Sequence, residues 1–159
     1  MIINFMNDGI FEIKTTKGKI TTGDEISINE FKLPGAGEYE IGEIQAEVID
    51  NITIFHADGI SLGYLDKRKK PLEEKEIERI SDIDVLFVPV GGGDVFDAKE
   101  ASRAIAAIEP KIVIPMHYKD LEEFRKIEGA AGEGVENIKI SRDKLSSEER
   151  QIIVLNPKK

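Results

Sequence analysis

Short apolar segments that alternate with polar residues fill the first 65 residues of the chain. Alternation with a period of two predicts β-strands with one buried face, and the Asn, Asp and Gly residues between the segments predict turns. We therefore expect an antiparallel meander of six or seven strands. The segments with this pattern are Ile2–Met6, Ile10–Lys14, Ile26–Ile28, Phe31–Ile41, Ile44–Ile49, Ile52–His56 and Ile60–Leu65.

The middle of the chain has a different pattern. Val85–Val88 and Ile112–Ile114 are continuous apolar runs, which is typical of strands buried on both faces. Between them, Asp97 and Glu100 form a capping box ahead of apolar residues at helical spacing. Strand, helix and strand make a βαβ unit, and chemistry in such sheets collects beyond the carboxyl ends of the strands.

The remaining elements are weaker in pattern. Glu73–Ile80 is expected to be a helix, and Asp120 is expected to cap another. Asn137–Ile140 and Gln151–Leu155 are expected to be the final strands. A meander followed by βα units predicts an α/β (α+β) fold with mixed sheets and flanking helices, in a single domain over residues 1–159.

Composition narrows the function classes. The net charge is −9, and an acidic protein repels phosphate backbones and anionic membranes. The chain has no cysteine, which excludes disulfides, thiolate nucleophiles and thiolate metal sites. No apolar run approaches the roughly 20 residues of a membrane span. We expect a cytoplasmic protein without nucleic-acid or membrane partners.

Three pieces of the sequence together resemble one known family. They are Gly35–Ile41 (GAGEYEI), Asp84–Gly92 (DVLFVPVGG) and Glu109–Tyr118 (EPKIVIPMHY). In this order and spacing they resemble the metallo-β-lactamase superfamily, in its branch of uncharacterised zinc-dependent hydrolases. The resemblance covers roughly residues 31 to 155.

The resemblance implies a four-layer αβ/βα sandwich with a metal site at the edge between the sheets. It also implies a His-x-His-x-Asp-His signature in the N-terminal half. This chain lacks that signature, because its only histidines are His56 and His117. The segment ahead of Gly35 is also short, so we expect a truncated N-terminal half.

When each metal ligand of the family is matched to a position of this sequence, two candidate ligands remain. His117 matches the last histidine ligand, and Asp66 lies at or next to the bridging aspartate. A catalytic zinc needs about three protein ligands and an open position. Two candidates fall short of that number, although a mixed site with Asp94 or Glu38 stays open.

Other residues have simpler interpretations. His117 alone is either an acid or base or a remnant that holds its neighbours in place, and we favour the remnant. His56 matches no ligand and is expected to be a half-buried or edge histidine. Gly91–Gly93 before a helix is typical of a phosphate site, but Asp94 and Asp97 disfavour an anion there, and a plain turn is the preferred interpretation.

Three hypotheses follow. The first is a degenerate metallo-β-lactamase-fold protein without a dinuclear metal site or cofactor, with a binding or structural role and an unknown small-molecule ligand. Exposed strand edges then favour a homo-oligomer. The alternative is a zinc-dependent hydrolase of phosphoester, lactone or amide bonds, with a reduced or subunit-shared site around His117. Nucleotide binding through the glycine turn is a weaker third option.

Overall fold

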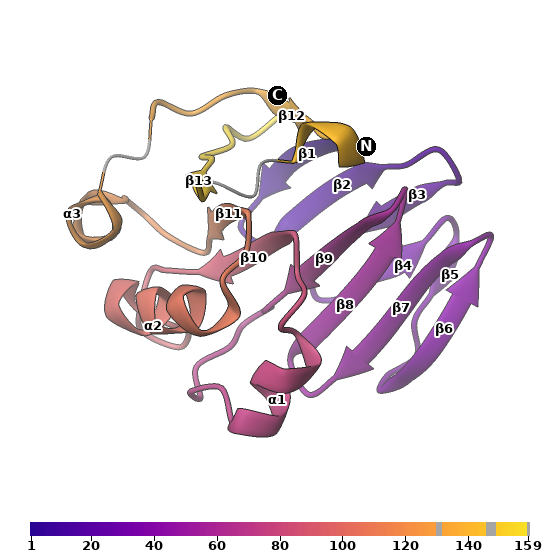
Figure 1. Ribbon diagram of the computed structural model, residues 1–159, viewed down its shortest axis with the longest axis horizontal. Helices are drawn as coiled ribbons and strands as arrows, with labels where there is room; N and C mark the ends of the chain where they lie inside the picture. Colours follow the sequence, from indigo (N-terminus) through magenta and orange to yellow (C-terminus); the bar gives the residue numbers. More distant parts are fainter. Residues whose placement is uncertain (130–131, 146–148, 159) are drawn as a thin grey trace.

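Two β-sheets lie face to face, and helices lie against the outer face of one of them (Figure 1). This computed structural model describes residues 1–129, 132–145 and 149–158. The six-stranded sheet has the spatial order β12 (Asn137–Lys139), β1 (Ile2–Asn7), β2 (Ile10–Lys14), β3 (Lys19–Thr21), β4 (Ser27–Ile28) and β5 (Phe31–Lys32).

The second sheet has seven strands and carries the βαβ unit. Its order is β13 (Gln151–Ile152), β11 (Ile112–Met116), β10 (Val85–Pro89), β9 (Ile60–Tyr64), β8 (Ile52–Ala57), β7 (Ile44–Ile49) and β6 (Gly37–Ile41). Strands β6 to β9 pair antiparallel, whereas β10 pairs in parallel with both β9 and β11. The sheet is therefore mixed, as expected.

The helices are short and follow the chain order of the second half. They are α1 (Glu74–Arg79), α2 (Ala98–Ile108) and α3 (Glu122–Glu128), and a 3₁₀ turn, η1, spans Arg142–Lys144. None of the helices in the described ranges has the length and apolar character of a membrane span.

Strand β10 shows why its sequence is continuously apolar. Val85 and Phe87 face the other sheet, where Phe87 packs edge-on against Phe11 with ring centroids 4.7 Å apart. Leu86 and Val88 face the helices on the opposite side. Both faces of this strand are buried, so alternation of apolar and polar residues disappears.

The predicted single meander is wrong in its topology. The first half forms nine strands, and the chain leaves the six-stranded sheet after β5 and enters the seven-stranded sheet at β6. The predicted segment Phe31–Ile41 spans this crossing. The alternating pattern reports which face of a strand is buried, but it carries no information on which strand lies beside it.

The helix predictions differ in outcome. The capping box of α2 is confirmed, because the Asp97 carboxylate accepts from the N–H of Glu100 at 2.8 Å. Asp120 does not cap α3 as predicted. Helix α3 begins one residue later, with Leu121 in the cap position, and Asp120 accepts only from the N–H of Glu122 at 3.1 Å.

The layers of the sandwich also differ from the expectation. The core between the two sheets and the core between the seven-stranded sheet and its helices are both present. Across residues 1–129, 132–145 and 149–158, no α-helix packs on the outer face of the six-stranded sheet (Figure 1). The described part of the chain thus has three layers where the resemblance implied four.

The two aspartates at the helix starts make a direct comparison possible. We expect Asp97→Ala to lower the free energy of unfolding by about 1 kcal/mol, because it removes a side-chain cap. Asp120→Ala is expected to lower the free energy of unfolding by only about 0.3 kcal/mol, because Asp120 does not occupy the cap position. Urea denaturation followed by circular dichroism measures both, and equal losses would contradict the assignment of the caps.

Candidate functional site

Three loops meet at one edge of the seven-stranded sheet. The carboxyl ends of β9, β10 and β11 lie side by side because these strands are parallel. The loops that follow them carry Asp66, Gly91–Gly93 and His117, respectively. This edge is where ligands of open α/β sheets bind, and it holds both residues carried over from the resemblance.

The backbone at His117 is tightly constrained. His117 directly follows β11 and has a left-handed φ of 52°, which is rare for residues with a side chain. Gly91 packs against it so closely that a Cβ at Gly91 would clash with the His117 backbone O. The glycine of the predicted turn is therefore required by this close approach.

The imidazole of His117 is half-buried and lacks a hydrogen-bond partner at one nitrogen. Its Nε2 is buried, and no described residue bonds to it. Burial lowers the pKa of His117 below its ordinary value, while the carboxylates of Asp66 and Asp8 act in the opposite direction. Burial prevails, so the fold favours the neutral imidazole.

Asp66 lies on the same side of this edge as His117. Both residues line a hollow of about 180 Å³ together with Asp8, Asp24 and Tyr64. Burial raises the pKa of Asp66, and the charges of His117 and Lys67 oppose that shift. The Tyr64 hydroxyl lies 3.5 Å from the Asp66 Oδ1.

The turn between β1 and β2 covers this hollow. The backbone O of Gly9 accepts from the Tyr64 hydroxyl at 2.7 Å and from the Thr22 hydroxyl at 2.9 Å. A hydroxyl can donate only one proton. The Tyr64 hydroxyl therefore donates to the O of Gly9, at 2.7 Å, rather than to the more distant Asp66 carboxylate at 3.5 Å. A Cβ built on Gly9 would lie 2.5 Å from the His117 Nε2. The turn thus rests directly on the imidazole.

Sequence reasoning missed the residues of this turn as part of the site. Asn7–Gly9 is a recognisable hairpin signal, but a local turn signal does not reveal the distant residue that it contacts. Gly9 is 108 positions from His117 in the sequence. Tyr64 and Thr22 were missed for the same reason.

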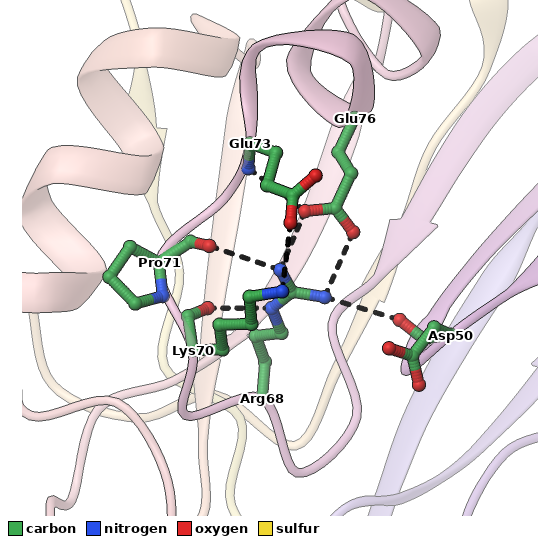
Figure 2. Close-up of polar contacts among 6 residues, drawn as sticks. All are labelled: Asp50, Arg68, Lys70, Pro71, Glu73 and Glu76. Carbon is green, nitrogen blue, oxygen red and sulfur yellow. Dashed lines mark hydrogen bonds and ion pairs between the residues drawn. The ribbon is translucent and has the colours of Figure 1, made fainter.

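A buried arginine holds the loop that carries Asp66 (Figure 2). Arg68 is only 2% exposed, and its guanidinium binds the Glu76 carboxylate with two bonds of 2.6 and 3.0 Å. It also donates to the backbone O atoms of Asp50, Lys70 and Pro71. These bonds connect the loop to α1 and to the β7–β8 turn, and a paired buried charge of this kind is costly to break.

A second hollow lies against the glycine turn. It has a volume of about 680 Å³, and Gly91–Asp94, His117, Tyr118 and Glu123 are among its lining residues. Asp94, one of the alternative ligands, therefore shares a hollow with His117. Glu38 does not, because it lines a separate hollow together with His56.

The described residues do not by themselves form a complete catalytic metal site. His117 and Asp66 are brought together, but among residues 1–129, 132–145 and 149–158 no group of three or more His, Asp or Glu side chains is arranged to hold an ion. A catalytic zinc needs about three protein ligands. A metal role for His117 and Asp66 stays a prediction.

His56 is exposed, but it lies on the central strand β8, which pairs with both β7 and β9, so the expectation of a half-buried or edge histidine is wrong. Its Nδ1 lies 3.2 Å from the Ser61 hydroxyl, near the surface of β8 and β9. It lines the same hollow as Glu38 and Arg79 rather than the hollows beside His117.

Residues 10–117 match a family model described as the beta-lactamase superfamily domain. The chain belongs to this superfamily. The match confirms the resemblance and includes Asp66, Gly91–Gly93 and His117.

Curated relatives carry hydrolase names. A UPF0173 metal-dependent hydrolase of Pyrococcus horikoshii is 32% identical over 108 residues, which are 62% of this chain and 45% of the relative. A UPF0173 metal-dependent hydrolase of Nanoarchaeum equitans is 35% identical over 113 residues, or 66% of this chain and 48% of the relative. The chain thus spans about half the length of these relatives.

Solved structures share the fold. A protein from Thermotoga maritima, described as a Zn-dependent hydrolase of the metallo-beta-lactamase superfamily, superimposes with a TM-score of 0.85, 21% identity and 97% coverage of both chains. Igni18, a metallo hydrolase from Ignicoccus hospitalis, gives a TM-score of 0.63 and 13% identity over 88% of this chain and 99% of its own. At these identities the likeness establishes the two-sheet fold alone.

The burial of His117 leads to a pH prediction for metal-free protein in a chelator. We expect the imidazole pKa to lie below the ordinary value of about 6.5, since desolvation disfavours the charged ring. The His56→Gln variant leaves a single imidazole, whose ring protons can be titrated by NMR.

The same shift affects stability. The contribution of the neutral imidazole is complete above the unfolded-state pKa of about 6.5 and declines as the pH falls through the folded pKa. His117→Asn is expected to lose this part of the pH dependence of unfolding. A pKa at or above the ordinary value would contradict the buried, neutral ring.

Arg68 gives a stability prediction with a matched control. Arg68→Met is expected to lower the free energy of unfolding by about 3–5 kcal/mol, because the Glu76 carboxylate loses its partner. Lys69→Met, on the same loop, removes an exposed ion pair with Glu100. This variant is expected to change the free energy of unfolding by about 0.5 kcal/mol or less. Chemical denaturation measures both variants.

A double variant separates the ion pair from the other bonds of Arg68. Arg68→Met with Glu76→Leu removes both charges, so it is expected to recover part of the loss but not all of it. The backbone O atoms of Asp50, Lys70 and Pro71 remain without their donor. If Arg68→Met lowers the free energy of unfolding no more than Lys69→Met does, the buried arginine does not hold the loop.

Proposed function

We propose that this chain contributes His117 and Asp66 to a metal-dependent hydrolase site that a second polypeptide completes. The observation that carries this proposal is the His117 Nε2, which is buried beside Asp66 without a hydrogen-bond partner. A buried imidazole nitrogen normally has a partner, and a metal ion or a donor from another chain would provide one.

The donor count supports a shared site over a complete one. The described residues place two donors together, whereas a catalytic zinc takes about three and keeps an open position. The remaining ligands would come from a second copy of this chain or from a longer relative. The relatives that this chain matches are named metal-dependent hydrolases, which supports this reaction class for the assembled site.

The candidate reaction is hydrolysis of a lactone, amide or phosphoester bond, as the family resemblance implies. In this arrangement His117 is held by its left-handed backbone and by Gly91, and Asp66 is held by the loop that Arg68 binds. Fixed positions of this kind are what a ligand set requires.

A second candidate is favoured by the turn at Gly9. It rests on the imidazole and binds Tyr64 through its backbone O, so it occupies the space where a substrate would approach His117. This contact supports a metal-free binding or structural role, as the first sequence hypothesis proposed.

Metal analysis combined with mass measurement distinguishes these functions. Protein without a histidine tag is stripped with a chelator, incubated with zinc or manganese, and analysed for metal content and for mass by light scattering. We expect metal to be retained only in an assembled form, at less than one ion per chain. His117→Ala is expected to abolish retention, and His56→Ala, which removes the other histidine, is expected to preserve it.

The other outcomes are equally specific. One ion per monomer that depends on His117 would overturn the shared site and leave the hydrolase assignment in place. If neither metal is retained in any assembly state, or if retention does not depend on His117, the metal-free role is the better account.

A further inference from the structure

A recess lined by both aliphatic and polar side chains opens next to Asp66. It has a volume of about 290 Å³ and lies between the loop before β4, the loop between β5 and β6, and the β7–β8 hairpin. Gly23, Asp24 and Asp66 line both this recess and the hollow beside His117. The two spaces therefore adjoin at these residues, and a ligand in the recess would lie next to the hollow that His117 lines.

The walls of the recess present aliphatic side chains. Ile26, Leu33 and Val48 are each only partly buried, and Ile52 forms a buried part of the lining. The N–H of Leu33 donates to the O of Ile26 at 2.9 Å, so these two residues continue the pairing of β4 with β5 and lie side by side. Val48 and Ile52 come from the β7–β8 hairpin, and the polar residues Glu25, Asn51 and Thr53 complete this part of the lining. An aliphatic group placed against the aliphatic side chains would remove apolar surface from water on both partners.

The charges where the spaces meet disfavour an anion. Asp8, Asp24 and Asp66 line the hollow beside His117, and Lys67 is the cation that faces them. Its ammonium is already paired with Asp24 at 2.7 Å. An incoming phosphate would therefore meet excess negative charge.

The neighbouring hollow adds to this excess. Asp94, Asp120 and Glu123 line it with Lys119. One divalent ion at His117 would reduce the negative charge of the region, but the carboxylates would still outnumber the cations.

We propose that the recess binds the aliphatic arm of an uncharged acyl compound, a lactone or an amide, in preference to a phosphoester. This inference rests on the proposed function for the position of the reacting bond at His117. The binding itself depends on the recess and its charges, so it can be measured without turnover and without a metal.

Methyl NMR in a chelator tests the proposal directly. Protein with labelled Ile, Leu and Val methyl groups is titrated with N-butylacetamide, which is uncharged, and with butyl phosphate, which has the same arm. We expect the amide to shift the methyl signals of Ile26, Leu33 and Val48 and to bind about tenfold or more tightly than butyl phosphate, a difference of about 1.4 kcal/mol.

Three variants make the test specific. Leu33→Ala is expected to weaken amide binding about threefold or more, a loss of about 0.7 kcal/mol or more. Val135→Ala removes an exposed apolar side chain that does not line the recess and is expected to have no effect. Asp24→Asn removes a carboxylate and releases Lys67, so it should narrow the difference between the two ligands even if Leu33→Ala is poorly folded.

Several results would overturn the inference. These are methyl shifts confined to other parts of the protein, butyl phosphate binding as tightly as the amide, or equal losses in Leu33→Ala and Val135→Ala. Absence of metal retention would contradict the proposed function while leaving these binding results unchanged, so the two failures are distinguishable.

Discussion

Parallel pairing of β10 with both of its neighbours is the constraint on which the rest of this structure depends. It brings the carboxyl ends of β9, β10 and β11 to one edge of the sheet, and the loops beyond them carry Asp66, Gly91 and His117. Parallel strands are stable only when both faces are covered. The second sheet and the helices provide that cover, so the two cores and the site edge arise from one arrangement.

Close backbone contacts and hydrogen bonds hold the loops at this edge. His117 has a left-handed backbone that Gly91 accommodates, and its imidazole touches the turn at Gly9. Asp66 lies on the same loop as Arg68. The Arg68 guanidinium binds backbone O atoms of this loop and of the β7–β8 turn, and the carboxylate of Glu76 in α1 (Figure 2). Hydrogen bonds to a buried guanidinium define direction as well as distance, which is how a loop without secondary structure acquires one position.

The site combines a family scaffold with two candidate ligands. Membership of the superfamily is established by the sequence match over residues 10–117 and the fold by the structural neighbours. Within the described residues only His117 and Asp66 are brought together as carried-over ligands, and the β1–β2 turn lies over them. The scaffold accounts for the position of the site, and the donors decide what chemistry it supports.

The sequence by itself determined the local elements of this protein. Continuous apolar runs predicted the buried strands β10 and β11, Asp97 and Glu100 predicted the start of α2, and the motif pieces indicated the superfamily. Each of these signals is carried by residues close together in the chain, where periodicity and capping act directly. The candidate residues His117 and Asp66 were found in the same way, through short motifs.

Only the tertiary structure decided how these pieces meet. It divided the expected meander between two sheets, started α3 at Glu122 instead of beside Asp120, and placed Gly9 against His117. Strand partners, and contacts between residues more than 100 positions apart, depend on which arrangement buries the most apolar surface while satisfying the backbone. That is a property of the whole chain, and no segment of the sequence carries it alone.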